Sequence, residues 1–522
     1  MQNSVYPKIV VKGSSGQDPK VLRDGDDFYM VNDGCVFFPG FPILHSKDLI
    51  HWEHISDAVT DCEWAREAGL DAVDNPYGFW AGALFKHNGK YYVFVDFAYH
   101  ESKEEGAIEG PIAVYVTCAD TPYGPWEKPW HLISTKHGID PNFFCDDNGD
   151  CYLFVKNDIL ESPEIVAYRI SSDCRSVLGG PFSIWEGHKQ GCSEGPAVFK
   201  KDGYYYLTIS EGGTGFYHRT NMARAKNILG PYEANPYNPL LHEDDFSLPL
   251  QKLGAATLTF DNSGRWWAVH HCGRPFKGED GGLYCPVGRE ACISPMKWTE
   301  DGWLKGDLGE DGYKGLPDLP ECDYSMSNTD EFDGERLSEN WVYYRTPDYS
   351  LFDLNKRKGW LGIKSNGFDF NERLCKSRIF VFATDFKYEA STYMEADLKD
   401  EGQAGIALFY DERNYVIFAL NDDGKITVEE RICGKYKPLY VVDAPQTQGI
   451  ELKIKVDNQS TRFAYCINNE EFELDFTFDT FLISDEAVMK DGGGYSGAKI
   501  GIFVSGKDSS ADFDYFRYIE KE

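Results

Sequence analysis

Apolar and charged residues alternate in the C-terminal part of the chain, a pattern that is typical of β-strands. Residues 450–457 read IELKIKVD, and every second side chain up to residue 456 is apolar. Because successive side chains of a strand point to opposite faces, this stretch predicts a half-buried strand. Residues 403–432 continue in the same manner, with short apolar strands around turns. We expect residues 331–522 to form a β-sandwich.

The N-terminal part repeats one design five times. Each copy opens with a marked residue and continues with a short apolar strand, a polar turn containing glycine and an aromatic strand, as in SEGPAVFKKDGYYYLTIS. The marked residues lie 62, 60, 54 and 61 residues apart and are Asp18, Trp80, Asp140, Glu194 and Ala255. In the last four copies a turn glycine follows nine residues later, at Gly89, Gly149, Gly203 and Gly264. A unit of about 60 residues that carries a small antiparallel sheet is the size of a β-propeller blade.

Together these patterns predict an all-β chain with two domains. We expect a five-bladed β-propeller in residues 1–315, followed by the β-sandwich in residues 331–522. The segment between them, residues 316–330, reads LPDLPECDYSMSNTD. It is rich in proline and polar residues, which is typical of a linker.

Composition narrows the classes of function. The formal net charge of −33 makes nucleic acid an unfavourable partner. No apolar run approaches the length of about 18 residues that a membrane helix needs, and the first ten residues lack the features of a signal peptide. The 14 cysteines include no CxxC pair, which argues against a zinc site and against a disulfide scaffold. We expect a cytoplasmic protein, or a periplasmic or secreted one whose signal peptide has been removed.

Three of the marked residues are carboxylates, and a propeller would bring them together. Equivalent positions of the blades meet near the mouth of the central channel, so Asp18, Asp140 and Glu194 are expected to converge. Because like charges repel, a fold would not gather three carboxylates for stability alone. The segment DDNGD at residues 146–150 resembles a calcium loop, and calcium binding is the other use for such carboxylates. The repeat, however, places this segment in a hairpin turn.

Glycoside hydrolysis is a chemistry that needs carboxylates in opposite protonation states. One carboxylate stays ionised and activates water, while the other stays protonated and gives its proton to the leaving oxygen. A third, ionised near the acid, raises the pKa of that acid. Trp80, at the equivalent position of the second blade, offers a flat apolar face to a sugar ring.

Six segments, in this order along the chain, resemble glycoside hydrolase family 43, and most closely its two-domain β-xylosidases and α-L-arabinofuranosidases. The segments are DPKVLRDGDDFYMVND, FFPGFPILHSKDLIHWEHI, GIDPNFFCDDNG, SEGPAVFKKDGYYYLTISEGGTGFYH, NPYNPLL and VGREACISPMKW. The resemblance implies a five-bladed propeller, a concanavalin-like β-sandwich and hydrolysis that inverts the anomeric centre. By the same resemblance Asp18 is the general base, Asp140 the residue that orients the acid and modulates its pKa, and Glu194 the general acid.

The resemblance also implies residues that bind substrate. Arg289 matches an arginine that reaches towards the sugar at the non-reducing end, and Phe38 resembles an aromatic wall of the pocket. His218 matches a histidine of the family. Each has a structural alternative: an ion pair of Arg289 with Glu290 or Glu300, a core position for Phe38 and a structural imidazole for His218.

Three positions depart from the family pattern. Gln17 and Gly82 stand where the family usually has proline, and Ala255 stands where it usually has histidine. That histidine often touches a bound cation or water. No cofactor is expected to be required, and Ala255 counts against a structural calcium ion.

The sandwich contributes one more candidate. In KDGGGYSGAKIG, three glycines precede Tyr495, which is typical of a protruding loop with an aromatic tip. The resemblance implies that this loop narrows the active site, so Tyr495 is expected at the mouth of the cleft that holds Glu194.

The resulting hypothesis is an exo-acting, inverting glycosidase that releases D-xylose or L-arabinofuranose from short plant-cell-wall oligosaccharides. Two alternatives stay open: a glycan-binding propeller with weakened catalysis, motivated by Ala255, and a family 43 enzyme for another linkage, such as arabinan or galactan. The expected partner is an oligosaccharide, with no nucleic acid and no membrane, and homo-oligomerisation is left open.

Overall fold

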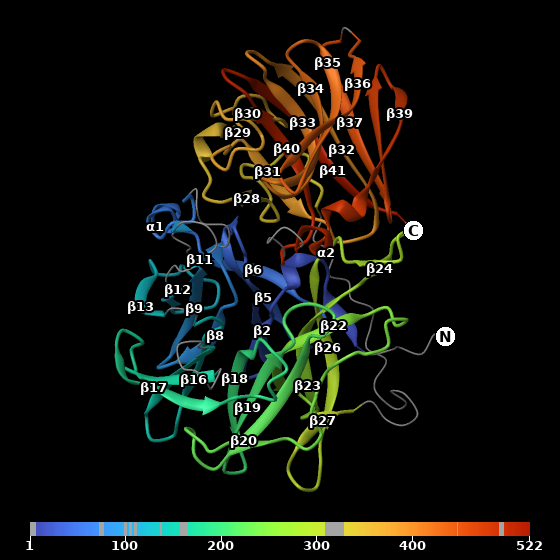
Figure 1. Ribbon diagram of the computed structural model, residues 1–522. Helices are drawn as coiled ribbons and strands as arrows, with labels where there is room; N and C mark the ends of the chain where they lie inside the picture. The colour runs from blue at the N-terminus through green and yellow to red at the C-terminus, as the bar shows by residue number, and fades with distance from the viewer. Residues whose placement is uncertain are drawn as a thin grey trace. The chain divides into compact units, whose positions relative to one another are not determined.

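The computed structural model describes residues 7–72, 78–98, 102–103, 107–108, 112–135, 138–156, 165–307, 328–445, 447–489 and 495–521. The chain is nearly all β (Figure 1) and divides into two compact units. The first unit joins Met1–Arg274 to Arg289–Tyr324, and the second joins Pro275–Gly288 to Ser325–Glu522. Residues 316–327 of the predicted linker lie outside the described residues. No helix within the described ranges is long and apolar enough to cross a membrane.

Five antiparallel sheets of four or five strands build the described part of the first unit, which confirms the predicted five-bladed propeller. Blade one contains β2 (Lys20–Asp24), β3 (Asp27–Val31), β5 (Gly40–Ser46) and β6 (Glu53–Val59). Blade two contains β7 (Gly78–Phe79), β8 (Ala83–His87), β9 (Lys90–Ala98), β12 (Ile112–Ala119) and β13 (Trp130–Thr135). Blade three contains β14 (Asn142–Cys145), β15 (Cys151–Lys156), β16 (Ile165–Ile170) and β17 (Val177–Trp185).

The last two blades follow the same plan. Blade four contains β18 (Glu194–Lys201), β19 (Tyr204–Glu211), β20 (Arg219–Ala225) and β21 (Glu233–Ala234). Blade five contains β22 (Gln251–Phe260), β23 (Trp266–Gly273), β26 (Arg289–Trp298), β27 (Leu304–Gly306) and, from the other end of the unit, β1 (Lys8–Val11). In β1, Lys8 pairs with Ile293 of β26, so the first strand of the chain completes the last blade.

Short elements connect these strands. They are η1 (Ser14–Gly16), β4 (Phe37–Phe38), α1 (Cys62–Glu67), and the pair β10 (Ser102–Lys103) and β11 (Ala107–Ile108).

The glycine of each repeat forms the tight turn between two consecutive strands of its blade. Gly89, Gly149, Gly203 and Gly264 all have positive φ, between 73° and 86°. Glycine adopts this left-handed conformation without the steric penalty that a Cβ would bring. The segment 146–150 is such a turn, because the backbone N–H of Asp146 donates to the carbonyl of Asp150. This confirms the hairpin that the repeat predicted there.

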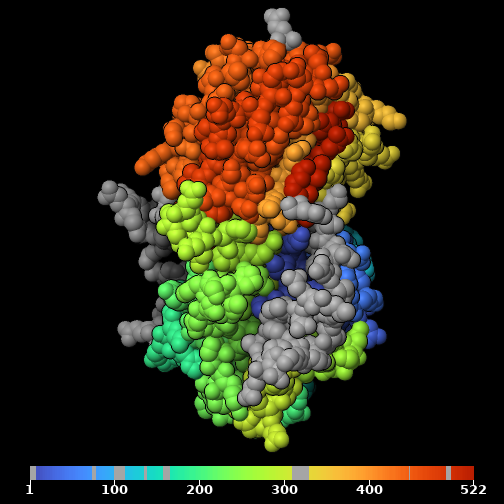
Figure 2. Space-filling model, turned by 90° about the vertical axis from the view of Figure 1, so that its right-hand side faces the viewer, coloured from blue at the N-terminus to red at the C-terminus, as the bar shows by residue number. Residues whose placement is uncertain are grey.

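Apolar side chains of neighbouring blades pack against each other. One core cluster joins Tyr206 and Met222 of blade four to Ala256 and Ala268 of blade five. In Figure 2 the part of the chain around residues 200–270 forms the green surface. Other clusters join blades one and two, two and three, and three and four in the same way. Because these sheets bury apolar residues between them, the inner strands are held firmly where their ends carry the marked residues.

The second unit is a sandwich of two antiparallel sheets (Figure 1). The strand order of one sheet is β36 (Lys435–Asp443), β35 (Lys425–Ile432), β34 (Asn414–Asn421), β33 (Gln403–Asp411), β40 (Lys499–Ser505), β31 (Arg378–Phe382) and β28 (Val342–Tyr344). The order of the other is β29 (Phe352–Asp353), β30 (Leu361–Lys364), β41 (Ser510–Glu520), β32 (Lys387–Asp397), β37 (Ile450–Asp457), β38 (Ser460–Ile467) and β39 (Glu470–Asp479). The short helices are η2 (Tyr349–Leu351), η3 (Thr480–Ile483) and α2 (Asp485–Val488).

The predicted strand at residues 450–457 is β37. Its side chains alternate between buried and half-buried up to residue 456, as the sequence pattern indicated. Its buried positions join the large core cluster of the sandwich.

A hairpin that lies within the propeller part of the sequence belongs to the second unit. Residues 275–288, placed by the sequence pattern within the propeller, form β24 (Phe276–Lys277) and β25 (Leu283–Tyr284). Phe276 packs on Phe386 with ring centroids 4.5 Å apart, and Tyr284 stacks on Phe481 at 5.2 Å. Aromatic packing therefore assigns this hairpin to the sandwich.

The expectation against disulfides was wrong at two places. Cys145 is bonded to Cys151, and Cys272 is bonded to Cys292. Both bonds link neighbouring antiparallel strands. Cys145 is directly opposite Cys151 in the pairing of β14 with β15. Cys292 on β26 is opposite His270, two residues before Cys272 on β23. Spacing along the sequence does not reveal such cross-strand pairs, since the sheet brings them together.

Candidate active site

The backbone has the same unusual conformation at three marked positions. Asp18, Asp140 and Ala255 all have positive φ, of 46°, 58° and 53°. Residues other than glycine seldom adopt this region, and where they do the surrounding structure must enforce it. In blade four the positive φ falls one residue later, at Gly195 with 61°. The equivalence of the blades therefore extends from the sequence pattern to the backbone at the ends of the inner strands.

Asp18 lies between an arginine and a histidine. Its Oδ2 accepts a hydrogen bond from Nη1 of Arg289 at 2.5 Å, and its Oδ1 lies 3.1 Å from Nδ1 of His271. Burial alone would raise the pKa of the carboxyl, but the charge of Arg289 and the hydrogen bond from His271 outweigh it and hold the pKa well below its usual range. Asp18 is therefore ionised at neutral pH, as a base that activates water must be.

Arg289 is held by residues around Gln17. Its Nη2 donates to Oε1 of Gln17 at 3.4 Å and lies 3.8 Å from Oδ2 of Asp33. The Gln17 amide in turn donates to Asp33. Burial and the charge of Asp18 raise the pKa of Asp33 well above its usual range. Gln17 thus replaces the usual proline with an amide that orients Arg289, whose ion pair is with Asp18 rather than with Glu290.

Asp140 and Trp80 are both anchored on Asp96, which is completely buried. The backbone N–H of Asp140 donates to Oδ2 of Asp96 at 3.0 Å, and the backbone N–H of Trp80 donates to the carbonyl of Asp96 at 2.9 Å. Oδ2 of Asp140 accepts from the backbone N–H of Gly195 at 2.8 Å. Asp140 therefore lies directly beside Glu194, and the half-buried Trp80 shares its support.

Glu194 has the raised pKa that a general acid needs. Burial first, and then the negative charge of Asp140, raise its pKa to about 8. Nζ of Lys156 lies 3.7 Å from Oε2 of Glu194 and opposes part of this rise. Burial and the charge of Asp18 also raise the pKa of Asp140. The charges of Lys20 and Lys156 and the hydrogen bond from the Gly195 N–H lower it by a smaller amount.

Two buried imidazoles lie beneath the base. The rings of His218 and His271 have centroids 4.4 Å apart, and Nδ1 of His218 lies 2.5 Å from the carbonyl oxygen of Gly213. His271 pairs directly with Gly254 across the strands β22 and β23. The imidazole of His271, on the neighbouring strand β23, therefore contacts the base Asp18. This contact lies next to Ala255, which replaces the usual histidine. Burial lowers the pKa of both rings, so both are neutral at pH 7.

These imidazoles do not fit a calcium ion. Ca²⁺ takes six to eight oxygen ligands, whereas the groups beside Gly254 are ring nitrogens. The Nε2 atoms of His218 and His271 are buried and have no hydrogen-bond partner in the described residues.

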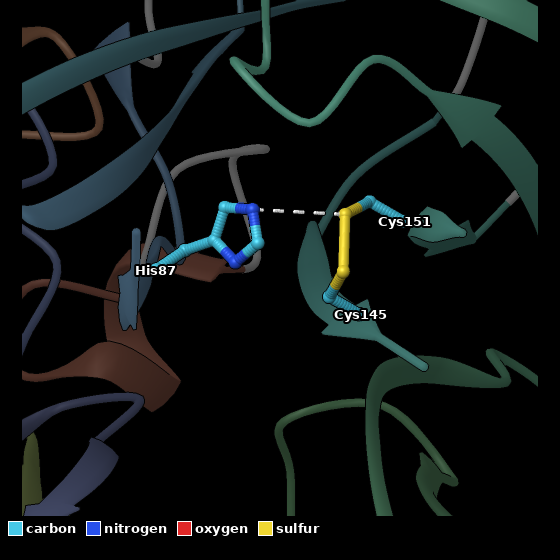
Figure 3. Close-up of side chains that lie close together, drawn as sticks. All are labelled: His87, Cys145 and Cys151. Atoms are coloured by element: carbon cyan, nitrogen blue, oxygen red, sulfur yellow. Dashed lines mark hydrogen bonds between the residues drawn. A yellow bond between two sulfur atoms is a disulfide. The ribbon is translucent and has the colours of Figure 1, made fainter. Parts of the chain in front are cut away.

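A second group of potential metal ligands lies in blades two and three. Within the described ranges, His87, Cys145 and Cys151 bring one ligand atom each to within 4.8 Å of the others. Figure 3 shows the His87 ring facing the disulfide, with Nε2 3.8 Å from Sγ of Cys151. The two sulfurs are bonded to each other and are not thiolates, so the group as it stands is not a metal centre.

Of two further predicted substrate contacts, Phe38 lies in the core of the first unit, and the position of Tyr495 relative to the cleft stays a prediction. Phe38 is completely buried in the core cluster of blades one and two, with Phe41 and Phe79, which is the packing role left open above. Tyr495 belongs to the second unit. Gly82, the third departure from the pattern, is tightly packed, because a Cβ there would lie 2.6 Å from Phe41.

Gly254 has to be a glycine because of His218. A Cβ at Gly254 would lie only 1.4 Å from Cδ2 of His218, so Gly254→Ala must displace the ring. We expect a loss of about 1–3 kcal/mol in the free energy of unfolding, measured by thermal or urea denaturation. Gly215→Ala, where the added Cβ meets nothing within 4 Å, is the control. Equal stability of the two variants would contradict the tight contact, and His218→Ala should suppress the loss in a double variant.

Sequence reasoning missed several residues of the site. Lys20, Lys156 and His271 all act on the three carboxylates. Lys20 follows Asp18 by two residues in the segment DPKVLRDGDDFYMVND, so its closeness to Asp18 along the chain could have identified it. His271 is 253 residues from Asp18 in sequence, and only the pairing of β22 with β23 shows that it lies beside the base.

The chemistry of the site follows from its protonation states. Asp18 is ionised and hydrogen-bonded, Glu194 is protonated up to about pH 8, and Asp140 lies beside Glu194. A pair of carboxyls whose pKa values are pushed apart in this way provides a base and an acid on one scaffold. On a five-bladed propeller this pair defines a glycoside hydrolase.

Comparison with known proteins gives the family. The model for glycosyl hydrolases family 43 matches residues 7–304, and the model for the beta xylosidase C-terminal concanavalin A-like domain matches residues 329–519. The chain belongs to glycosyl hydrolases family 43, as the sequence resemblance indicated. Both the enzyme class and the two-domain fold predicted above are thereby confirmed.

Named relatives span the full chain. A beta-xylosidase of Bacillus subtilis is 30% identical, covering 98% of this chain and 99% of its own length. A non-reducing end alpha-L-arabinofuranosidase of Bacteroides ovatus is 31% identical over 96% of this chain and 92% of its own. The crystal structure of a family 43 protein from Bacillus licheniformis has a TM-score of 0.88 at 33% identity, covering 99% of this chain and all of that one. A xylan beta-1,4-xylosidase from Bacillus halodurans has a TM-score of 0.85 at 29% identity, with the same coverage.

Proposed function

We propose that the protein is an exo-acting, inverting glycosidase that releases D-xylose or L-arabinofuranose from short plant-cell-wall oligosaccharides. The observation that carries the proposal is the opposite displacement of two pKa values: that of Asp18 is lowered and that of Glu194 is raised. In an inverting reaction Asp18 takes a proton from water as the water attacks the anomeric carbon. Glu194 gives its proton to the departing oxygen in the same step.

The sugar is inferred from the relatives. A beta-xylosidase and an alpha-L-arabinofuranosidase match this chain at nearly equal identity, so both pentoses are candidates. A panel of nitrophenyl glycosides decides between them, and it includes arabinan- and galactan-type substrates as the alternative linkages. Turnover of none of these glycosides, together with binding of an oligosaccharide, would support the glycan-binding alternative instead.

The stereochemistry has its own test. Inversion requires a water molecule between base and sugar and a carboxyl separation of about 6.5–9.5 Å. Proton NMR of the first-formed sugar should show the anomer opposite to that of the substrate. Formation of the same anomer would identify Asp18 as a nucleophile.

The pKa values give the pH dependence of the reaction. Glu194 must be protonated, so kcat/KM should fall as the pH rises through about 8. Asp18 must be ionised, and because its pKa is held well below the usual range of a carboxyl, the acidic fall should lie at lower pH than for an ordinary aspartate. We expect a plateau across about pH 5–7 in kcat/KM for a nitrophenyl pentoside. A sharp acidic fall at about pH 6 would contradict the ion pair between Asp18 and Arg289.

We further propose that Tyr495 contacts the substrate at the mouth of the cleft. The support is its aromatic ring and the glycine-rich sequence that precedes it. Tyr495→Ala should raise KM for oligosaccharides several-fold while the melting temperature stays nearly unchanged. A melting temperature that falls with no change in KM would assign Tyr495 to packing.

The metal requirement of the enzyme and its location in the cell are two further proposals. We propose that no metal is required, and dialysis against EDTA should leave kcat unchanged. We also propose a cytoplasmic location for the enzyme, where short oligosaccharides are its substrates, and fractionation of the source cells tests this. A loss of activity in EDTA that Ca²⁺ restores would overturn the first proposal.

A further inference from the structure

Lys20 is a buried cation beside the catalytic carboxylates. It begins β2, only 5% of its surface is exposed, and its Nζ has no hydrogen-bond partner in the described residues. Burying an ammonium group without an acceptor is unfavourable, because its three N–H donors lose their hydrogen bonds to water. The cost is offset when another molecule, such as a substrate, supplies hydrogen-bond acceptors for these donors.

Gly195 shows where the ammonium group lies. A Cβ built on Gly195 would be 3.8 Å from Nζ of Lys20. The N–H of this same glycine donates to Oδ2 of Asp140, and Glu194 is the preceding residue. Burial lowers the pKa of Lys20, while the charges of Asp140, Asp18 and Glu194 oppose this. The buried ammonium group thus lies close enough to all three carboxylates to interact with their charges.

The other two cations of the site have carboxylate partners. Arg289 is bound to Asp18, and Lys156 lies 3.7 Å from Glu194. Lys20 has the charge of these residues but no such contact in the described ranges. Its donors are therefore available to an oxygen atom between the acid and the base. That space is where an inverting glycosidase holds the sugar ring whose bond is broken.

We propose that Lys20 is a further substrate-binding residue, whose ammonium group donates hydrogen bonds to a hydroxyl oxygen of the bound terminal sugar. The inference rests on the proposed function and deepens it by naming a contact that selects the sugar. A sugar that presents a hydroxyl at this point satisfies the buried donors, and one that lacks it leaves them unpaired. Unpaired buried donors are a strong basis for discrimination.

Kinetics of Lys20→Met test the contact. Methionine fills a similar volume without donors or charge. We expect KM for the best nitrophenyl glycoside, and Ki for the free sugar that it releases, to rise about tenfold or more. Lys86→Met is the control, because Lys86 is also an inner-strand lysine of a neighbouring blade but pairs with Asp24 at 2.7 Å. Values of KM and Ki within twofold of the wild type would overturn the proposal.

Monodeoxy substrates identify the hydroxyl. Removing the contacted hydroxyl should lower kcat/KM strongly in the wild-type enzyme and only slightly in Lys20→Met, because the variant has no donor left to satisfy. Removal of any other hydroxyl should affect both proteins alike. Additive losses for every deoxy substrate would mean that Lys20 does not touch the sugar.

The pH profile separates this role from a structural one. A positive charge favours the ionised form of nearby carboxylates, so its removal raises their pKa values. Both limbs of kcat/KM should therefore move to higher pH in Lys20→Met and return towards their original positions in Lys20→Arg. A variant that is merely misfolded loses activity equally at every pH, and its melting temperature falls with it.

Two outcomes distinguish this inference from the proposed function. If the wild-type enzyme cleaves no pentoside but cleaves another glycoside of the panel, the sugar assignment fails, and Lys20 is tested on that glycoside. If the enzyme cleaves none, the Lys20 proposal falls together with the catalytic assignment. If the wild-type enzyme cleaves a pentoside and Lys20→Met matches it in KM, Ki and pH profile, the proposed function stands and the role of Lys20 alone fails.

Discussion

Asp18→Asn should reduce kcat/KM by about 10³–10⁴-fold for every glycoside, whatever its leaving group. Asparagine has nearly the same shape as aspartate, but its amide cannot accept a proton from water. The substitution also removes the anion that Arg289 and His271 contact. The measurement is kcat/KM for a series of aryl glycosides whose phenols differ in acidity, with a parallel loss expected throughout.

Asp24→Asn is the matched control for this substitution. Asp24 is the last residue of β2, the strand that follows Asp18, and it pairs with Lys86 rather than with a group of the site. Its replacement should change kcat/KM less than about twofold. Residual activity of Asp18→Asn above a tenth of the wild type would show that another group activates the water.

Glu194→Gln should separate substrates by their leaving groups. A short oligosaccharide leaves as an alkoxide unless it is protonated, so its hydrolysis should fall about 10³-fold or more. A dinitrophenyl glycoside needs little protonation and should lose about tenfold. The alkaline limb near pH 8, which belongs to Glu194, should disappear from the profile of the variant.

Glu186→Gln is the control for the acid. Glu186 is paired with Lys189 at 2.8 Å and lies outside the group of carboxylates. It should keep the alkaline limb and the activity on both classes of substrate. Equal losses for good and poor leaving groups in Glu194→Gln would remove Glu194 from the role of general acid.

The repeat made much of this structure predictable. Equivalent positions in five similar segments had to meet at one end of a propeller, so the convergence of Asp140 and Glu194 followed from spacing alone. The turn glycines gave the hairpins, and the alternation at residues 450–457 gave a strand with the correct buried face. Each of these features follows from a pattern that recurs along the sequence, either in every repeat or at every second residue.

Other features depend on contacts between distant segments. His271 reaches Asp18 because β22 pairs with β23, and Gln17 reaches Arg289 from the opposite end of the propeller sequence. The Cys272–Cys292 bond and the docking of residues 275–288 with the sandwich are of the same kind. Phe38 is fully buried in the core. The sequence alone does not show whether such an aromatic residue lines a substrate pocket or packs in the core.

The pairing of β1 with β26 has a consequence for how the enzyme is made. During synthesis on the ribosome, Asp18 emerges early, but Arg289 follows 271 residues later. The first strand of the nascent chain must wait for the fifth blade before it finds its place in a sheet. The base is therefore ionised and oriented only after the two ends of the propeller sequence have met. A truncated or stalled chain contains all three carboxylates but lacks a working base, so the appearance of activity reports that the ring has closed.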